Sequence, residues 1–300
     1  MKGNIIKRMK KNYVGYIMIA PLFIGLLIFA YYPPVYGIGV SLFEKQGENV
    51  VFCGLKNYSK LFSDKIFLNS IPTMFYLMIP KLLIGVFVPL IAAEMVFGVK
   101  SCKMQGFYRI LLLLPMLAPG VVGTLIWKAV YDPNGGIMST VVQGLGFVGK
   151  NKVIDWLGDP DLVIFSIIFM GFPWIGGTNV LIYLAGLNVV SGEIMESARL
   201  DGAGAFKRIW FIDLPLLLGQ IRYFLVFGII GGLQDYSVQV VLTNGGPGYS
   251  TYVPGYYMYH QAFMFFNKYY AAAIGCVLFV VIMVLTLVVS KLTGKDKTET

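Results

Sequence analysis

Long apolar runs, separated by shorter polar segments, extend along almost the whole chain. A helix needs about 20 consecutive apolar residues to cross a hydrocarbon core of about 30 Å. Six runs of the chain reach that length, so the pattern predicts six membrane-spanning helices. In chain order, the predicted spans are Tyr13–Tyr32, Asn69–Phe97, Phe107–Val130, Asp161–Gly186, Leu216–Val240 and Tyr269–Ser290.

Prolines and glycines interrupt several of these runs. A proline inside a helix removes a backbone hydrogen bond and clashes with the preceding turn. We therefore expect the first span to end before Pro33 and the second to be interrupted at Pro80 and Lys81. The third run contains Pro119, and we expect the segment 172–178, which is rich in proline and glycine, to break the fourth.

The composition supports an integral membrane protein. Hydrophobic residues make up 57% of the 300 residues, charged residues make up 13%, and the mean hydropathy is +0.73. A soluble domain carries about 25% charged residues. A chain with half that share has too few charged side chains to cover a surface in water, so the expected fold class is all-α integral membrane. Ordinary soluble enzymes, disordered chains and disulfide-rich scaffolds are excluded.

The distribution of charge predicts the orientation. The net charge of +9 comes from 24 Lys and Arg against 15 Asp and Glu. Fourteen of the cationic residues lie in polar segments on one side of the predicted spans and six on the other, and cytoplasmic segments carry such an excess. Both termini are therefore expected in the cytoplasm, and the first span, which no small-residue cleavage site follows, is expected to remain as an anchor. The predicted organisation is a cytoplasmic segment 1–12, a transmembrane domain 13–290 with an inner loop at 187–215, and a cytoplasmic tail 291–300.

The sequence offers no set of residues for catalysis or for metal binding. Its three cysteines are far apart and His260 is its only histidine, so we expect no metal site. The segment 144–151 approximates a phosphate-binding loop, but Asn151 stands where a Ser or Thr is needed, and no buried strand precedes it. We expect neither an enzyme nor a nucleotide site in this chain, so any ATP must be bound by a partner.

The third inner loop predicts two short helices. Glu196 falls in the first of them, where negative charge suits the N-terminal turns of a helix. Gly202 breaks this helix, because glycine tolerates a positive φ. Phe206 and Trp210 stand at helical spacing in the second helix, which Pro215 is expected to close. The alternative is an amphipathic connector lying at the membrane surface, which needs no glycine break.

The same loop resembles the EAA motif of permeases from ABC importers. In that motif, a Glu-Ala-Ala element precedes Asp-Gly-Ala, an aromatic residue and an Ile-x-Leu-Pro element, and Ser197 replaces the middle alanine here. A Gly-Gly-Pro loop follows at the distance seen in that family. Over nearly the whole chain, the sequence is similar to the permeases for maltose, glycerol phosphate and oligosaccharides, in particular to the member of each pair that carries the Gly-Gly-Pro loop. The matching residues are Glu196, Ala198, Asp201, Gly202, Ala203, Phe206, Ile212, Leu214 and Pro215, followed by Gly245, Gly246 and Pro247.

The resemblance implies a permease with the type I importer fold in the bacterial cell membrane. Glu196 would pair with a basic residue of a partner ATPase, and Gly202 would form the turn of a coupling helix. The ATPase would bind ATP and magnesium, and this chain would hold no cofactor. The expected assembly contains a second homologous permease, two ATPase subunits and an extracellular solute-binding protein. It would import a sugar, in particular an oligosaccharide, by alternating access.

Polar side chains inside the predicted spans are candidates for the substrate pathway, because polar groups are costly in lipid. The charged ones are Lys81, Glu94, Arg222 and Asp235. For Asp235, a structural pairing between spans is the alternative, and the glycines in 228–232 are expected to serve helix packing. A sugar site also needs an aromatic face. The candidate contacts are Trp174, Thr178, Gln234, Asp235 and Tyr236.

Two other functions stay open at this point. One is a permease of the same superfamily for a solute that is not a sugar. The other is an ion-coupled secondary transporter, a class that shows internal repeats and an acidic residue at mid-membrane. No convincing repeat is present, and Glu94 and Asp235 are the acidic residues that could serve. The dependence of uptake on ATP distinguishes the secondary transporter from the importer.

Overall fold

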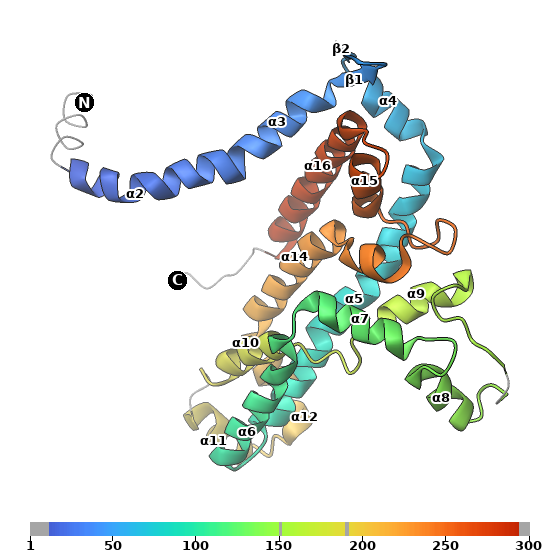
Figure 1. Ribbon diagram of the computed structural model, residues 1–300. Helices are drawn as coiled ribbons and strands as arrows, with labels where there is room; N and C mark the ends of the chain where they lie inside the picture. The colour runs from blue at the N-terminus through green and yellow to red at the C-terminus, as the bar shows by residue number, and fades with distance from the viewer. Residues whose placement is uncertain (1–11, 150–151, 190–191, 294–300) are drawn as a thin grey trace. The chain divides into compact units, whose positions relative to one another are not determined.

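The computed structural model describes residues 12–149, 152–189 and 192–293, and in this part the chain is mainly helical (Figure 1). One two-stranded β-hairpin accompanies the helices there. The chain forms two compact units. Among the described residues, the first contains 12–63 together with 258–279, and the second contains 64–149, 152–189, 192–257 and 280–293.

The first unit begins with an apolar helical stretch that does not end at its proline pair. A π-helical turn leads into a further α-helix, in which Pro33 and Pro34 stand in the first turn. Because the π-helical turn already interrupts the regular hydrogen-bond ladder, the missing N–H groups of the prolines cost little. The expected end before Pro33 is therefore wrong, and the helical stretch continues to Ser41. Its parts are α2 (Tyr13–Gly25), η1 (Leu26–Tyr31) and α3 (Tyr32–Ser41).

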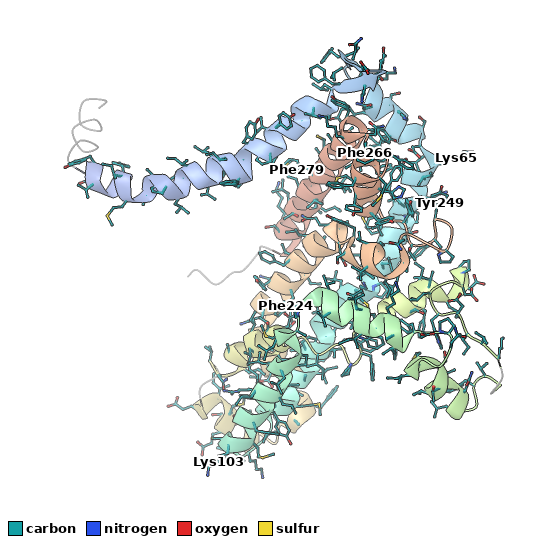
Figure 2. All side chains as sticks on the ribbon, in the orientation of Figure 1. Lys65, Lys103, Phe224, Tyr249, Phe266 and Phe279 are labelled. Carbon is teal, nitrogen blue, oxygen red and sulfur yellow. The ribbon has the colours of Figure 1, made fainter. Side chains whose placement is uncertain are left out.

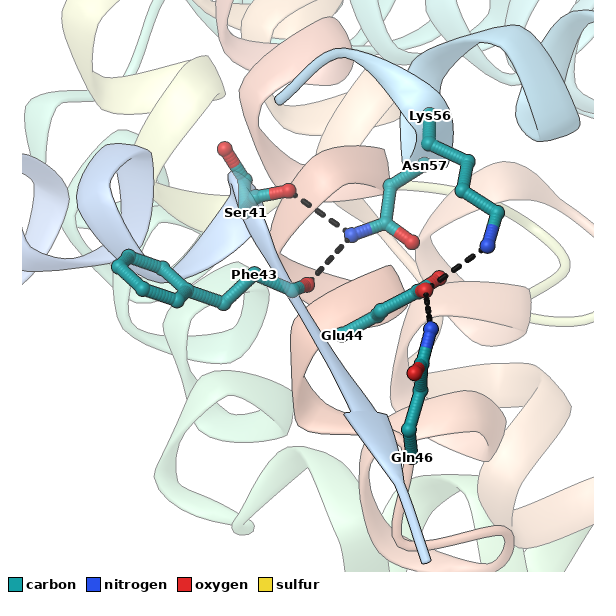
Figure 3. A network of polar contacts seen from close by, with 6 residues as sticks. All are labelled: Ser41, Phe43, Glu44, Gln46, Lys56 and Asn57. Atoms are coloured by element: carbon teal, nitrogen blue, oxygen red, sulfur yellow. Dashed lines mark hydrogen bonds and ion pairs between the residues drawn. The ribbon is translucent and has the colours of Figure 1, made fainter. Parts of the chain in front are cut away.

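A β-hairpin and a short helix follow, and Asn57 holds them to the end of α3 (Figure 3). The buried amide of Asn57 donates from Nδ2 to the carbonyl oxygens of Ser41, at 2.9 Å, and Phe43, at 2.8 Å. On the exposed side, Lys56 Nζ donates to Glu44 Oε1 at 2.8 Å, and this hydrogen bond lowers the pKa of the Glu44 carboxyl. The elements are β1 (Phe43–Gln46) and β2 (Asn49–Phe52), which are antiparallel, and α4 (Lys56–Ser63).

The second unit is organised around α5 (Lys65–Phe97), a continuous helix of 33 residues. Asp64 caps its N-terminus, because Oδ1 accepts hydrogen bonds from the backbone N–H groups of Ile66, at 2.9 Å, and Phe67, at 3.4 Å. The interruption expected at Pro80 does not occur, although the helix contains three prolines. Two later helices pack along α5, and such neighbours allow a membrane helix to continue through a proline.

The third and fourth apolar runs are each broken into two helices. The two helices of the third run meet at 86°, on either side of Pro119. The fourth run is broken between Phe169 and Gly177, which includes most of the expected segment 172–178. Among the described residues, four helices are long and apolar enough to cross a membrane, or five if the bent pair is one span. The elements are α6 (Cys102–Leu113), η2 (Leu114–Leu117), α7 (Gly120–Val130), α8 (Ile137–Gly144), α9 (Pro160–Phe169) and α10 (Gly177–Leu187).

A loop of two helical arms and the last apolar runs complete the chain. We call residues 192–216 the two-arm loop; its arms meet at Gly202, as the sequence predicts. Pro215 does not close the second arm, because it stands in the first turn of a further helical segment, and the chain turns at Leu217 instead. The elements are α11 (Gly192–Leu200), α12 (Ala205–Arg208), η3 (Ile209–Asp213), α13 (Leu214–Leu216), α14 (Leu218–Gln234), η4 (Gln239–Thr243), α15 (Pro254–Phe263) and α16 (Lys268–Thr293).

The core of the second unit lies between α5, α10 and α14. Tyr183 of α10 and Phe224 of α14, the latter labelled in Figure 2, are buried there with ring centroids 4.9 Å apart. Two glycines of α14 allow it to approach α5. A Cβ atom on Gly228 or Gly232 would lie 2.4 Å or 2.5 Å from side chains of α5, so these positions serve close helix packing.

Candidate functional site

A cavity of about 740 Å³ opens in the second unit between α5, α10 and the segment that runs from α14 into η4. Its walls are largely apolar and carry a few polar groups, which is the usual character of a ligand pocket. Three of the five contacts expected from the sequence are among its lining residues. The polar lining residues are Lys81, Thr178, Asn179, Gln234, Asp235 and Gln239, and the aromatic ones are Tyr223, Phe224 and Phe227.

Asp235 lies at a break in the fifth apolar run. The helix α14 ends at Gln234, and the backbone of Asp235 is extended, with φ −71° and ψ 123°. Its Oδ1 accepts hydrogen bonds from Ser237 N at 3.1 Å and from Ser237 Oγ at 2.6 Å. The carboxylate therefore caps the helical segment that follows, and this capping holds it at the cavity wall.

Lys81 brings a positive charge to the same cavity. Lys81 and Asp235 both line the cavity, but they do not form one of the ion pairs found among the described residues. The cavity therefore presents opposite charges that do not close on each other. The sequence marks Lys81 as a charge within an apolar run, yet it does not show that α5 turns this residue toward Asp235.

Trp174 and Tyr236 do not line the cavity. The ring of Trp174 packs edge-on against those of Phe169 and Phe172, at centroid distances of 5.5 Å and 5.1 Å. Its Nε1 donates to a backbone carbonyl of α9 at 3.2 Å. The side chain of Tyr236 lies beside Gly255, where an added Cβ would be 3.4 Å from the ring. The aromatic wall of the cavity comes from α14 instead.

The turn of the two-arm loop depends on Gly202. Its φ is +71°, which favours glycine, and beyond its two chain neighbours no atom lies within 4 Å of the position of an added Cβ atom. Ala203 N donates to Ala198 O at 2.9 Å, the long-range bond of a Schellman turn, and Asp201 N donates to Ser197 O at 2.9 Å. Local chemistry therefore forms this turn without support from the rest of the fold.

An exposed surface of aromatic and acidic groups lies on the two-arm loop. Phe206 is 80% exposed and Trp210 is 59% exposed, and their rings stack with a centroid distance of 6.4 Å. Glu196 and Asp201 are also exposed. A cluster of large aromatic side chains on a polar loop is typical of a surface that another protein covers.

The second arm is also joined to α5 by charged groups. Arg208 Nη2 donates to Glu94 Oε2 at 2.9 Å, and Arg208 Nε donates to Asp213 Oδ2 at 2.7 Å. The side chain of Asp213 is fully buried and that of Glu94 nearly so. The guanidinium carbon lies 5.3 Å from the centre of the Phe97 ring. The sequence shows Glu94 as an acidic residue in an apolar run, but it gives no sign of its partner.

The loop that carries Gly245, Gly246 and Pro247 is closely packed. Gly245 is buried with φ +81°, and an added Cβ would lie 2.2 Å from the ring of Tyr252. Thr251 Oγ1 donates to the carbonyl of Gly246 at 2.9 Å. Burial raises the pKa of the Tyr252 phenol to about 12. Both the backbone conformation and the available space therefore require glycine at the first position of this loop.

Sequence comparison relates this chain to known transport proteins. The family model described as binding-protein-dependent transport system inner membrane component matches residues 66–293. The chain is 30% identical over 266 residues to the diacetylchitobiose uptake system permease protein NgcF of Streptomyces coelicolor, with 83% of this chain and 73% of the relative covered. It is 30% identical to the arabinooligosaccharides transport system permease protein AraP of Bacillus subtilis, with 96% and 91% covered. It is 27% identical to the lactose transport system permease protein LacF of Rhizobium radiobacter, with 91% of each chain covered.

Structural comparison gives the fold. A chain from a bacterial ABC transporter involved in the import of the acidic polysaccharide alginate matches with a TM-score of 0.85 and 23% identity, over 98% of this chain and 100% of the other. The alginate ABC transporter in complex with an alginate pentasaccharide-bound periplasmic protein matches with a TM-score of 0.85 and 24% identity, over 98% of each chain. The chain therefore has the same fold as these chains of the alginate ABC transporter.

Proposed function

Because this chain belongs to the family of binding-protein-dependent transport system inner membrane components, we propose that it forms the membrane pathway of a bacterial ABC importer for a sugar, in particular an oligosaccharide. Members of the family are transport permeases and not enzymes, in agreement with the sequence prediction. The resemblance of the sequence to ABC importer permeases is confirmed by the family match and by the sugar permeases among its relatives.

The cavity between α5, α10 and α14 is the observation that carries this proposal. Its lining residues offer hydrogen-bond donors and acceptors, among them Lys81, Asn179 and Asp235, beside the aromatic rings of Tyr223 and Phe227. A sugar ring has hydroxyl groups at its edge and apolar C–H groups on its faces, so it needs both kinds of wall. The names of the curated relatives, which refer to diacetylchitobiose, arabinooligosaccharides and lactose, support the same class of solute.

The two-arm loop is the proposed contact with the ATPase. Phe206 and Trp210 would enter the interface, and Glu196 would pair with a basic residue of the ATPase. The Schellman turn at Gly202 would hold the two arms as one rigid element. ATP and magnesium would bind to two ATPase subunits, whose closure would drive the change between inward-facing and outward-facing states. A second homologous permease would complete the pathway.

The proposed membrane arrangement has six spans with both termini in the cytoplasm. The helices α9 and α10 are each too short to cross alone, and together they would form the fourth span. The Gly-Gly-Pro loop would then face outside, toward an extracellular solute-binding protein. Its tight packing around Gly245 supports a role as a fixed docking element.

ATP-dependent uptake tests the proposal. The complex is purified through this chain from its own membranes, its subunits are identified, and it is reconstituted in vesicles with its binding protein. We expect an ATPase and a second permease to co-purify, and oligosaccharide uptake to require hydrolysable ATP. The variant Glu196→Ala should lose most of the ATPase, whereas Glu193→Ala, an exposed glutamate one turn earlier in α11, should retain it.

Other outcomes would assign the chain differently. Uptake that follows an ion gradient without ATP would replace the importer by a secondary transporter. ATP-dependent uptake of a solute other than a sugar would retain the importer and change the solute class. Recovery of the chain alone or only as copies of itself would contradict the proposed assembly.

A further inference from the structure

One polar contact of the second unit that the pathway itself does not explain joins Arg208 to two carboxylates. Glu94 belongs to α5 and Asp213 to the second arm, so the guanidinium bridges two separate elements. Its ring contact, Phe97, also belongs to α5. The second arm is thus attached to the C-terminal end of α5 by one side chain that uses two of its nitrogens.

A gain in folding stability alone does not explain this arrangement of charges. Removing charges from water is costly, and a buried ion pair often contributes no more than well-packed apolar residues would. Here two carboxylates meet one guanidinium, with side-chain exposures of 8% for Glu94, 0% for Asp213 and 21% for Arg208. A planar guanidinium instead fixes geometry, because its hydrogen bonds from Nε and Nη2 to different carboxylates orient both carboxylates.

The same helix carries the wall of the cavity. Lys81 and Glu94 both belong to the continuous helix α5, in which a rise of about 1.5 Å per residue separates them by about 20 Å. The other end of the attachment is just as direct, because Arg208 follows the exposed Phe206 by half a turn within α12. A displacement of the two-arm loop therefore has a direct polar link to a continuous helix that also lines the cavity.

We propose that Arg208 is a positioning residue that transmits movement of the two-arm loop to α5, and through α5 to the cavity wall. Asp213 holds the guanidinium within the second arm, and Glu94 is the link to α5. This inference rests on the proposed function, since it assumes that an ATPase moves the loop. It assigns coupling to a contact within this chain, separate from the surface that meets the ATPase.

The variant Glu94→Ala tests the link without leaving an unpaired charge. It removes the acceptor on α5, while Arg208 and Asp213 remain as a balanced pair inside the second arm. In the reconstituted complex, we expect the ATPase to remain bound and its hydrolysis rate to fall less than twofold, while sugar uptake falls at least tenfold. The number of sugar molecules moved per ATP therefore falls at least fivefold. Glu94→Gln, which keeps an oxygen acceptor for Arg208, should restore part of this ratio.

Lys100→Ala is the matched control. It removes an exposed positive charge just after the C-terminal end of α5, outside the two-arm loop, and should leave the transport ratio unchanged. An unchanged ratio in Glu94→Ala, or uptake and hydrolysis that fall in equal proportion, would overturn the inference. Loss of the ATPase from the Glu94→Ala complex would assign the contact to assembly and overturn it as well. Failure of the proposed function would be recognised separately, because the unmodified complex would then show no ATP-dependent uptake.

Discussion

Two residues with opposite charges, Lys81 and Asp235, face one cavity without forming an ion pair. Their charges balance, so a neutral solute that hydrogen-bonds to both leaves no net charge uncompensated in a low-dielectric site. Asp235 has a second task as the cap of the segment that follows it. Among the described residues Lys81 makes no such structural bond, so a substitution of Asp235, unlike one of Lys81, has to keep an acceptor for Ser237.

Substitution of either charge should impair transport more than folding. Asp235→Asn keeps an oxygen that accepts from Ser237, so the helix break should persist while the charge is lost. Lys81→Met keeps the length of the side chain. We expect each to reduce uptake about tenfold or more, corresponding to about 1.4 kcal/mol, with the ATPase still bound. The measurement is uptake in vesicles, with Lys128→Met on the exposed side of α7 as control. Uptake at the unmodified rate in both variants would remove these residues from the pathway.

Gly202 and Gly204 form a matched pair in the two-arm loop. Gly202 has φ +71°, whereas Gly204 has φ −65°, and beyond their chain neighbours neither has an atom within 4 Å of an added Cβ. Gly202→Ala should therefore cost about 1–2 kcal/mol through backbone conformation alone, and Gly204→Ala should cost little. We expect ATPase binding to weaken several-fold in Gly202→Ala only, as measured by titration of the ATPase onto the purified permease. Equal binding by the two variants would show that the turn does not position the arms.

At the scale of elements, the second helix of the broken fourth run, α10, is in close contact with α6. An added Cβ on Gly177 at the start of α10 would lie 2.3 Å from the carbonyl oxygen of Leu112 in α6. A backbone oxygen cannot turn away as a flexible side chain can. The break between α9 and α10 thus places a glycine where two helices touch at their backbones.

Gly177→Ala should destabilise the protein through this contact. Overpacking of a well-packed contact costs about 1–3 kcal/mol, so we expect a lower midpoint of thermal unfolding in detergent. Gly231→Ala is the comparison, because alanine favours helix and the added Cβ of Gly231, which lies in α14, would have no atom within 4 Å apart from its chain neighbours and the backbone of its own helix. Its midpoint should be unchanged or higher. A Gly177→Ala protein as stable as the original would show that α10 can shift away from α6.

At the scale of the whole molecule, lipid and partners must cover the apolar surface that the chain itself leaves exposed. No residue of α2 or η1 is buried, although both are strongly apolar. An apolar surface of this extent does not remain in water. The excess of cationic residues on one side of the predicted spans predicts the orientation in which these helices are inserted.

Cysteine labelling tests this orientation with sites that the chain already suggests. Cys102 is exposed in the segment between the second and third predicted spans, which the proposed topology places inside. Glu48 is exposed in the hairpin turn between the first and second predicted spans, which it places outside. In a protein with Cys53→Ser and Cys276→Ser, a membrane-impermeant maleimide should label Cys102 only after permeabilisation of the cells. With Cys102→Ser and Glu48→Cys, labelling should occur on intact cells. The reverse pattern would invert the proposed topology.

The sequence predictions were most reliable for features that depend only on neighbouring residues. The apolar run 269–290 is one helix, and Gly202 makes the turn that its neighbours predict. The same rules were wrong at Pro33, Pro80 and Pro215, where they treated each proline as a stop. Position within the first turn of a helix, or packing against neighbouring helices, decides whether a proline ends a helix, and neither is visible from the proline itself.

The sequence by itself determined that this is an integral membrane protein, and it located the EAA-like loop and its motif residues. These features depend on the length of apolar runs, the distribution of charge and turn chemistry, all of which act between neighbours along the chain. Only the tertiary structure decided which charged residues meet. Glu94 and Arg208 are 114 positions apart, and Lys81 reaches the cavity of Asp235 only because α5 packs against α14. The tertiary structure also decided that the aromatic wall of the cavity belongs to α14, whereas Trp174 packs among the rings next to α9. A sequence gives each side chain its chemistry, and the packing of helices selects its partners.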